Sequence, residues 1–483
     1  MPDQLPLTLF NSLTRRLETF APVHAGEARV YTCGPTVYNY PHIGNMRAYV
    51  FADVLGRTLA WKGYALRHVI NITDVGHLTD DADAGEDKLE KAAAKSDRSI
   101  WDIARHYTEA FKADVKALNI REPAEWSVAT DYIEPMIAFA RSIADEHCYE
   151  LDSGLYFDVS TVADYGRLAR AITEDGEGRI DTVEGKRNPQ DFAIWRRTPA
   201  GETRQMEWDS PWGRGAPGWH LECSVMGEKL LGFPFDIHTG GIDHREIHHP
   251  NEIAQNQAFC GCGSLDDASH SGAKLWMHNN FLVERSGKMS KSSGEFLRLQ
   301  LLVDRGYHPL AYRMMCLQAH YRSELEFSWE GLGAALTRLK RIVMMVAKLR
   351  DPPTGAAPEA KLADIVSRFD AAMSDDLNTP QALVALEDAL SAKKVEDGAK
   401  RAVIEDMDRV LGLDLFALER SDLRIRPRDT QIAEEEIEAE LLRRKEARLA
   451  KDFATSDAIR ASLAARGVEV MDGDPLGWEW TLQ

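Results

Sequence analysis

One short segment near the start of the chain constrains the fold most, because it alternates strand, helix and strand signals. Residues 28–34 read ARVYTCG, where β-branched and aromatic side chains precede a Gly-Pro turn, and this pattern favours a buried strand. Apolar side chains recur at three-to-four spacing over residues 44–62 and predict a helix, which Gly63 can end. Residues 66–73, LRHVINIT, predict a second strand. Together these elements predict the βαβ unit of a doubly wound parallel sheet.

A second group of strand signals lies far downstream and indicates that this sheet is split. The two segments are FPFDIHTGG at 233–241 and LWMHNNFLV at 275–283, and a largely separate stretch precedes them. We therefore predict the α/β class. A split, doubly wound (Rossmann-like) parallel sheet is built from residues 1–94 and 216–297, with an inserted domain at 95–215.

After this sheet the periodicity becomes helical, and the chain divides at a turn-rich segment. DPPTGAAPE at 351–359 predicts a linker between a helical segment at 298–350 and a helical module at 360–428. At 429–483 a charged, helix-favouring run is followed by GVEVMDGDPLGWEW, which predicts a small strand-and-turn terminus.

Composition limits the class of protein. A chain of 483 residues is too long for one ordinary core and predicts roughly three or four domains. No apolar run of about 18 residues occurs and polar residues interrupt the N-terminal segment, so we expect no membrane span, no signal peptide and a cytoplasmic location. Six cysteines then indicate metal ligation or burial rather than disulfides. The net charge of -19 argues against a surface that binds nucleic acid throughout, so any RNA must contact a local basic patch.

Two short motifs point to a nucleotide. PHIGN at 41–45 lies between the first predicted strand and its helix, and KMSKS at 288–292 lies between glycines. The phosphates of a nucleotide require backbone N–H groups, a helix N-terminus and mobile cations, because charge builds on the α-phosphate as pyrophosphate leaves. The predicted catalytic residues are His42, Asn45, Lys288 and Lys291, and the predicted ATP-binding residues are His42, Gly44, Asn45, Lys288, Met289 and Lys291.

Taken alone, a His-Ile-Gly string is usually a turn, but the two motifs in this order resemble those of the class I aminoacyl-tRNA synthetases. Longer strings narrow the resemblance to the cysteinyl-tRNA synthetase family. They are LFNSLTRRLETFAPVHAGEARVYTCGPTVY at 9–38, NITD at 71–74, KRNPQDFAIW at 186–195, GWHLECS at 218–224, HYRSELEFS at 320–328 and, more loosely, LNTP at 377–380 and KDFATSDAIR at 451–460. The resemblance implies a monomeric cysteine–tRNA ligase. It would form a cysteinyl-adenylate from L-cysteine and ATP with Mg²⁺, and transfer the cysteinyl group to the 3′ end of tRNA(Cys).

The same resemblance implies one zinc ion per chain at the base of the amino-acid pocket. Its implied ligands are Cys33, Cys223, His248 and Glu252, and the implied amino-acid contacts are Cys33, Thr73, Trp219, His238 and Asp243. Thiolates, an imidazole and a carboxylate suit zinc, which binds a thiolate well and a serine hydroxyl poorly. Cysteine would then be selected by ligand chemistry without an editing domain. Asp243 suits the substrate ammonium group, and Trp219 suits a wall beside the small side chain.

These residues have simpler interpretations when the family is set aside. Cys33 and Cys223 alone are more often buried apolar residues, and His248 and Glu252 in HHPNE fit a helix start. The CGCG segment at 260–263 holds a tight cysteine pair, but no second pair nearby completes a four-ligand site, so we interpret it as a decoy.

The resemblance assigns tRNA contacts to the regions after the sheet: the acceptor stem to 298–350, further tRNA binding to 360–428 and the anticodon to 429–483. Two basic stretches are candidates for phosphate contacts, although a solvated helix face explains the first equally well. They comprise Arg338, Lys340, Arg341, Lys348 and Arg350, and then Arg443, Arg444, Lys445, Arg448 and Lys451. Trp478 and Trp480 are candidates for base stacking, but tryptophans near a terminus more often pack.

The chain departs from the family pattern at a few positions. Asn45 stands where the first motif usually ends in His, which keeps a hydrogen-bonding side chain but removes any positive charge. Ile247 and Pro250 also differ, and Ser-Gly-Glu follows KMSKS. Two alternative functions stay open: a ligase of the same superfamily that joins cysteine to a glucosaminyl-inositol acceptor, and an inactive nucleotide-binding paralogue. The residues after the linker favour tRNA, and the retained catalytic residues favour an enzyme.

Overall fold

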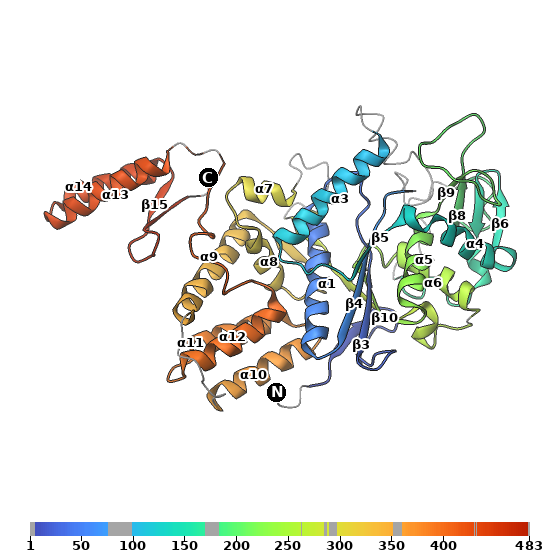
Figure 1. Ribbon diagram of the computed structural model, residues 1–483, viewed down its shortest axis with the longest axis horizontal. Coiled ribbons are helices and arrows are strands. Elements are labelled where there is room, and N and C mark those ends of the chain that lie inside the picture. The colour runs from blue at the N-terminus through green and yellow to red at the C-terminus, as the bar shows by residue number, and fades with distance from the viewer. Residues whose placement is uncertain are drawn as a thin grey trace.

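The centre of the molecule is a five-stranded sheet in the order β11–β10–β3–β4–β5, in which all neighbours run parallel (Figure 1). The computed structural model describes residues 5–75, 99–169, 183–261, 263–284, 297–350, 360–428, 430 and 432–481, and the backbone of 287–288. The strands are β3 (Glu27–Thr32), β4 (Ala65–Ile72), β5 (Glu125–Val128), β10 (Phe235–Gly241) and β11 (Ala273–Asn279). The predicted α/β class is confirmed.

The first three elements of the sheet match the prediction from the sequence. Helix α1 (Ile43–Trp61) connects β3 to β4, and the two strands pair in parallel from Glu27 opposite Ala65 onward. The apolar positions that predicted α1 are buried against the sheet and the helices beside it. Gly63 follows the helix at a φ of 93°, in the left-handed region that favours glycine. The βαβ unit is therefore confirmed.

The order in which the chain adds strands to the sheet reverses between β3 and β10. From β3 the chain adds β4 and β5 on one side, and from β10 it adds β11 on the other, so the two halves meet where β3 and β10 pair. Ligands of doubly wound folds bind outside the carboxyl ends of the strands at such a switch point. The fold alone thus indicates where a site should lie.

The predicted strand over 275–283 is two strands. β11 ends at Asn279, and the backbone N–H of Asn280 donates to the carbonyl of Tyr321 instead of continuing the sheet. β12 (Leu282–Glu284) then joins a small separate sheet, parallel to β14 (Leu325–Phe327) and antiparallel to β13 (Gly287–Lys288). The turn could not be predicted from the continuous apolar run, because the hydrogen bonds that form it come from residues distant in the sequence.

The predicted insertion at 95–215 begins too early. Its first part supplies helix α3 (Ile100–Ala117) and edge strand β5 to the parallel sheet, where β5 pairs with β4. The antiparallel part starts after β5 with α4 (Ile133–His147). Its four-stranded sheet consists of β6 (Cys148–Leu151), β7 (Gly154–Phe157), β8 (Phe192–Arg197) and β9 (Gly215–Pro217). Helix α5 (Trp219–Leu231) returns the chain to β10, and α6 (His248–Cys260) follows that strand.

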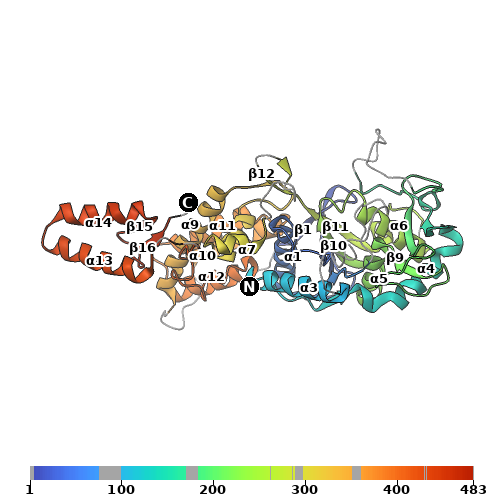
Figure 2. The same ribbon diagram turned by 90° about the horizontal axis from the view of Figure 1, so that it is seen from above.

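Helices dominate the rest of the chain, as predicted. They are α7 (Leu299–Asp304), α8 (Pro309–Leu317), α9 (Trp329–Val346), α10 (Ala360–Ser374), α11 (Thr379–Ser391), α12 (Asp397–Leu411), α13 (Glu434–Leu449) and α14 (Phe453–Ala465). The α13–α14 hairpin extends away from the body at one end of the molecule (Figures 1 and 2). The N-terminal hairpin is β1 (Thr8–Asn11) with β2 (Arg16–Thr19), and the C-terminal one is β15 (Val468–Val470) with β16 (Trp478–Trp480).

No helix in the described ranges is long and apolar enough to cross a membrane. The predicted linker at 351–359 lies outside the described residues.

Several residues of the first basic stretch form ion pairs with other parts of the chain. Arg338 and Arg341 both pair with Glu387 of α11, at 3.0 and 2.7 Å. Lys340 is buried and contacts both carboxylate oxygens of Glu479 at 2.6 Å. Carboxylates from distant segments thus balance the charges of these three residues, while Lys348 is exposed, and a contact of this stretch with tRNA phosphates stays a prediction.

The two C-terminal tryptophans are packed inside the protein. This is the simpler interpretation that the sequence offered beside base stacking. Trp478 and Trp480 are 0% and 6% exposed, and their rings meet edge to face at 4.8 Å. In the second basic stretch, Arg444 and Arg448 pair with Asp472 of the same terminal unit. The two tryptophans therefore belong to the buried apolar core of the protein.

We predict that Glu479 holds this unit to α9. Glu479 accepts bonds from Lys340, from Arg420 and from the backbone N–H of Ile425. Arg420 also pairs with Asp474, so Glu479→Gln leaves the buried ammonium group of Lys340 without its counter-charge. The expected cost is about 3 kcal/mol, measured as faster hydrogen exchange of the β15–β16 amides. Glu469 is directly opposite on β15 but exposed, and Glu469→Gln is the matched control. Equal exchange in the two variants would contradict the prediction.

Candidate active site

A single cavity of about 370 Å³ lies at the carboxyl ends of β3, β4, β10 and β11. It occupies the switch point of the sheet, and the first turn of α1 forms part of its wall. The residues predicted from the sequence that line it are Cys33, His42, Gly44, Asn45, Thr73, Trp219, Cys223, Asp243 and His248. The structure thus brings the predicted nucleotide residues of the first motif and most of the predicted amino-acid residues into one space.

His42 and Asn45 cap the helix that begins at the cavity. The backbone N–H of Asn45 donates to His42 Nδ1 at 3.1 Å, and the backbone N–H of His42 donates to Asn45 Oδ1 at 3.2 Å. This reciprocal pair is a capping box, which orients the first turn of α1. Since Nδ1 accepts a bond, a neutral His42 carries its proton on Nε2. The asparagine that departs from the family pattern therefore has a structural role here.

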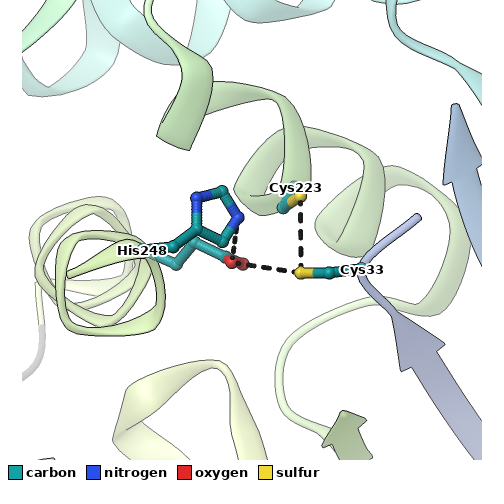
Figure 3. Close-up of side chains that lie close together, drawn as sticks. Cys33, Cys223 and His248 are labelled. Carbon is teal, nitrogen blue, oxygen red and sulfur yellow. Dashed lines mark hydrogen bonds and ion pairs between the residues drawn. The ribbon is translucent and has the colours of Figure 1, made fainter. Parts of the chain in front are cut away.

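Cys33, Cys223, His248 and Glu252 form a buried cluster at the base of the cavity (Figure 3). Cys33 directly follows β3, Cys223 lies in α5, and the other two lie one turn apart in α6. Cys33 Sγ is 3.9 Å from Cys223 Sγ and 3.7 Å from Glu252 Oε1, which is 2.9 Å from His248 Nε2. All four candidate ligand atoms lie within 4.8 Å of one another.

The donor set of this cluster fits a divalent metal ion. Burial would raise the pKa of Glu252, but His238 and His248 hold it well below its usual range. Burial would lower the pKa of His248, yet Glu252 and Cys223 raise it to about 10. Burial also opposes ionisation of Cys223, but hydrogen bonds from Cys33 and His248 lower its pKa to about 6. Buried negative charge is thus balanced by protons that a metal ion can replace, because metal ligands bind in deprotonated form.

A second set of donors shares the same space, and the sequence did not single it out. Cys33, His238, His249 and Glu252 also bring four ligand atoms within 4.8 Å of one another. His249 Nε2 is 3.3 Å from Cys33 Sγ, and its Nδ1 is 2.8 Å from His278 Nε2. The doubled histidine in HHPNE was the available signal, since both histidines lie one turn before Glu252 on α6.

His238 lies beneath the cavity and not on its wall. Its Nε2 is 2.8 Å from Glu252 Oε2, so it is a partner of the carboxylate, and its contact with the amino acid stays a prediction. The imidazole holds the second oxygen of Glu252, and His248 holds the first. Such outer partners fix the orientation of a metal-binding carboxylate.

The remaining predicted amino-acid residues face the cavity from three elements. Thr73 Oγ1, just after β4, donates to the fully buried Glu222 at 2.7 Å. The ring of Trp219 lies 4.2 Å from the ring of His248 and covers that side of the cluster. Asp243 lies close to the backbone of Gly241, where a Cβ would lie 2.4 Å from its Oδ1. Further lining residues not predicted are Asn71, His244, Asn279 and Phe281.

The second motif is described only where its hairpin begins. The backbone of Lys288 pairs with Val283 in β12, while Met289 and Lys291 lie outside the described residues. Of the CGCG cysteines, Cys260 is exposed at the end of α6, and Cys262 lies outside the described residues.

Comparison with known proteins identifies the family. The family model for the class I (C) tRNA synthetase catalytic domain matches residues 19–337. A Novosphingobium aromaticivorans protein named cysteine–tRNA ligase is 73% identical over 479 residues, which cover 99% of this chain and 97% of that protein. The chain belongs to the cysteine–tRNA ligase family. Zymomonas mobilis subsp. mobilis has a member that is 55% identical, with 98% of each chain covered.

Solved synthetases share the fold of this cysteine–tRNA ligase family member. Methionyl-tRNA synthetase of Mycobacterium tuberculosis, bound by methionyl-adenylate, matches with a TM-score of 0.52 at 17% identity, covering 80% of this chain and 90% of the other. The ternary complex of Agrobacterium radiobacter K84 agnB2 LeuRS with tRNA and LeuAMS matches with a TM-score of 0.56 at 12% identity, covering 94% and 95%. At these identities the likeness concerns the fold alone.

Removing one sulfur from the cluster should empty the metal site. In the cysteine–tRNA ligase fold described here, Cys223→Ser replaces a soft thiolate by a neutral hydroxyl, so we expect bound zinc to fall at least about tenfold, as measured by metal analysis of purified protein. Cys316→Ser is the control, because Cys316 is equally buried but lies in α8, outside both donor sets. Unchanged zinc in Cys223→Ser would refute this metal site.

Proposed function

We propose that this protein joins L-cysteine to tRNA(Cys) in two steps, through a cysteinyl-adenylate made from ATP. The observation that carries the proposal is the single cavity in which the capped first turn of α1 faces the buried sulfur cluster. A substrate with a thiol at one end and a carboxylate at the other fits between them. The carboxylate then lies toward α1, where ATP is proposed to bind.

The first step is attack of the cysteine carboxylate on the α-phosphate, with pyrophosphate leaving. The N-terminus of α1 directs the positive end of its helix dipole toward the proposed position of the phosphates. His42, with its proton on Nε2, donates to a phosphate oxygen as charge develops. Lys288 and Lys291 of the second motif are proposed to stabilise the leaving pyrophosphate, together with Mg²⁺. In the second step the 2′-hydroxyl of the terminal adenosine attacks the adenylate carbonyl, and AMP leaves.

Selectivity for cysteine is proposed to come from the buried cluster. A zinc ion held by Cys33, Cys223, His248 and Glu252 would supply a soft Lewis acid that binds a thiolate and not a hydroxyl. The protein contributes a dry surrounding, because all four of these residues are buried. Trp219 narrows the space above His248, and Asp243 is proposed to bind the substrate ammonium group. A hydrophobic pocket alone separates near-isosteres by only about 100-fold.

The helical regions after the sheet favour tRNA as the acceptor over a glucosaminyl-inositol. Residues 360–428 and 432–481 build further units, and the α13–α14 hairpin extends far from the cavity (Figure 2). A small amino-sugar acceptor has no use for so distant a surface, whereas the two ends of a tRNA are far apart. An inactive paralogue is disfavoured by the intact capping box and the intact donor set.

The proposal predicts cysteine-dependent exchange of pyrophosphate into ATP. Serine should support exchange with a kcat/KM at least about 10⁴-fold lower, and chelation of the metal should abolish the cysteine reaction until zinc is restored. The same preparation should charge tRNA and should leave glucosaminyl-inositol unmodified. Absence of cysteine-dependent exchange by the zinc-loaded protein would refute the activity, and exclusive use of the amino sugar would move it to the alternative ligase.

A further inference from the structure

Arg47 is a buried cation whose hydrogen bonds go to backbone carbonyls. It lies in α1, just after the capping box, and is 2% exposed. Its Nη1 donates to Asn280 O at 2.8 Å and to Phe281 O at 2.5 Å, and its Nη2 donates to Ser323 O at 2.6 Å and to His320 O at 3.3 Å. Within the described ranges no carboxylate forms an ion pair with it. Burial lowers the pKa of this guanidinium, so its position is maintained against a desolvation cost.

The two segments that Arg47 binds are the stems of one small sheet. Residues 280–281 lead into β12, and residues 320–323 lead into β14, which pairs with β12 from Leu282 opposite Leu325 onward. β12 also pairs with β13, where Val283 lies opposite Lys288. The guanidinium of Arg47 therefore fixes the position of this small sheet relative to α1. Because β13 belongs to the sheet, the position of the Lys288 backbone is fixed as well.

The same segment forms part of the cavity wall beside the first motif. Asn280, Phe281 and Leu282 line the cavity, and a Cβ on Gly44 would lie 3.6 Å from Leu282 Cβ. The backbone N–H of Ile43 also donates to Leu297 O at 2.8 Å. The first turns of α1 are thus tied to the chain on both sides of the second motif.

From these contacts we propose that Arg47 is a positioning residue for the nucleotide half of the reaction. It holds the wall at 280–282 and the β12–β13 hairpin, which carries Lys288, in register with His42 and Asn45. The inference rests on the proposed function for its kinetic consequence. The alternative is that Arg47 only stabilises the fold, in which case its loss would affect cysteine and ATP alike.

Arg313 offers a matched control for that alternative. It is also fully buried, and it also donates to backbone carbonyls, those of Leu118, Asn119 and Leu411. It pairs with Asp53 in α1 at 2.6 Å but contacts neither 280–282 nor 320–323. Arg313→Met therefore removes a comparable buried guanidinium that lies in α8 and binds α1, without touching the hairpin.

The experiment compares Arg47→Met, Arg47→Lys and Arg313→Met in the zinc-loaded full chain. For Arg47→Met we expect the KM for ATP in pyrophosphate exchange to rise about tenfold and kcat to fall about 10- to 100-fold. The KM for cysteine and the zinc content should change less than about twofold, because the cluster lies apart from Arg47. Arg47→Lys should be intermediate, since an ammonium group cannot bridge both segments. Arg313→Met should lower the melting temperature while keeping the ratio of the two KM values.

Two readouts judge the inference even if the wild type shows no exchange. Calorimetric titration with ATP should show weaker binding to Arg47→Met than to Arg313→Met, and hydrogen exchange of the Leu282 and Val283 amides should be faster in the Arg47 variant alone. Equal losses for ATP and cysteine, or matching behaviour of the Arg47 and Arg313 variants, would overturn the positioning role. Wild-type kinetics in Arg47→Lys together with unchanged ATP binding in Arg47→Met would do so as well.

Discussion

The pairing of β3 with β10 is the contact on which the whole site depends. The side-chain oxygens of Thr32 and Thr239 are 207 residues apart in the chain and 2.7 Å apart in space, and the N–H of Cys33 donates to Thr239 O. This pairing sets the end of β3 beside the helices that precede and follow β10. Those helices supply Cys223 and His248, so sulfur cluster and nucleotide-facing turn meet only because the two half-sheets meet.

Below the cavity, buried polar groups hold one another in place. Glu252 is 1% exposed and is bonded by His238 and His248, which is how a buried carboxylate keeps its charge. His249 approaches Cys33, and His278 behind it is 2.9 Å from the hydroxyl of Ser12. The outer contacts thus run from the N-terminal hairpin to the ligand atoms. They orient the donors before any ion binds, which reduces the rearrangement that binding requires.

The local pattern of apolar residues predicted β3, α1 and β4, because a buried strand or a buried helix face can be recognised from the spacing of apolar side chains in neighbouring residues. It missed β5, whose four residues EWSV carry too short a signal, and the turn at Asn280, which depends on Arg47 from 233 residues away. Spacing could not have joined Cys33 to Cys223, and their association came from the family resemblance. Charge was misleading at Lys340, since its partner Glu479 lies 139 residues away.

The split sheet also has a consequence for synthesis on the ribosome. The strands β3, β4 and β5 leave the exit tunnel long before β10, so the edge of β3 that will pair with β10 stays open while the antiparallel unit is translated. An unpaired parallel edge is a site for wrong association between nascent chains. The antiparallel unit can fold in that interval from contacts close in sequence. A truncated product that ends before β10 would carry PHIGN but would lack His248 and the complete cavity, so it would not compete for substrate.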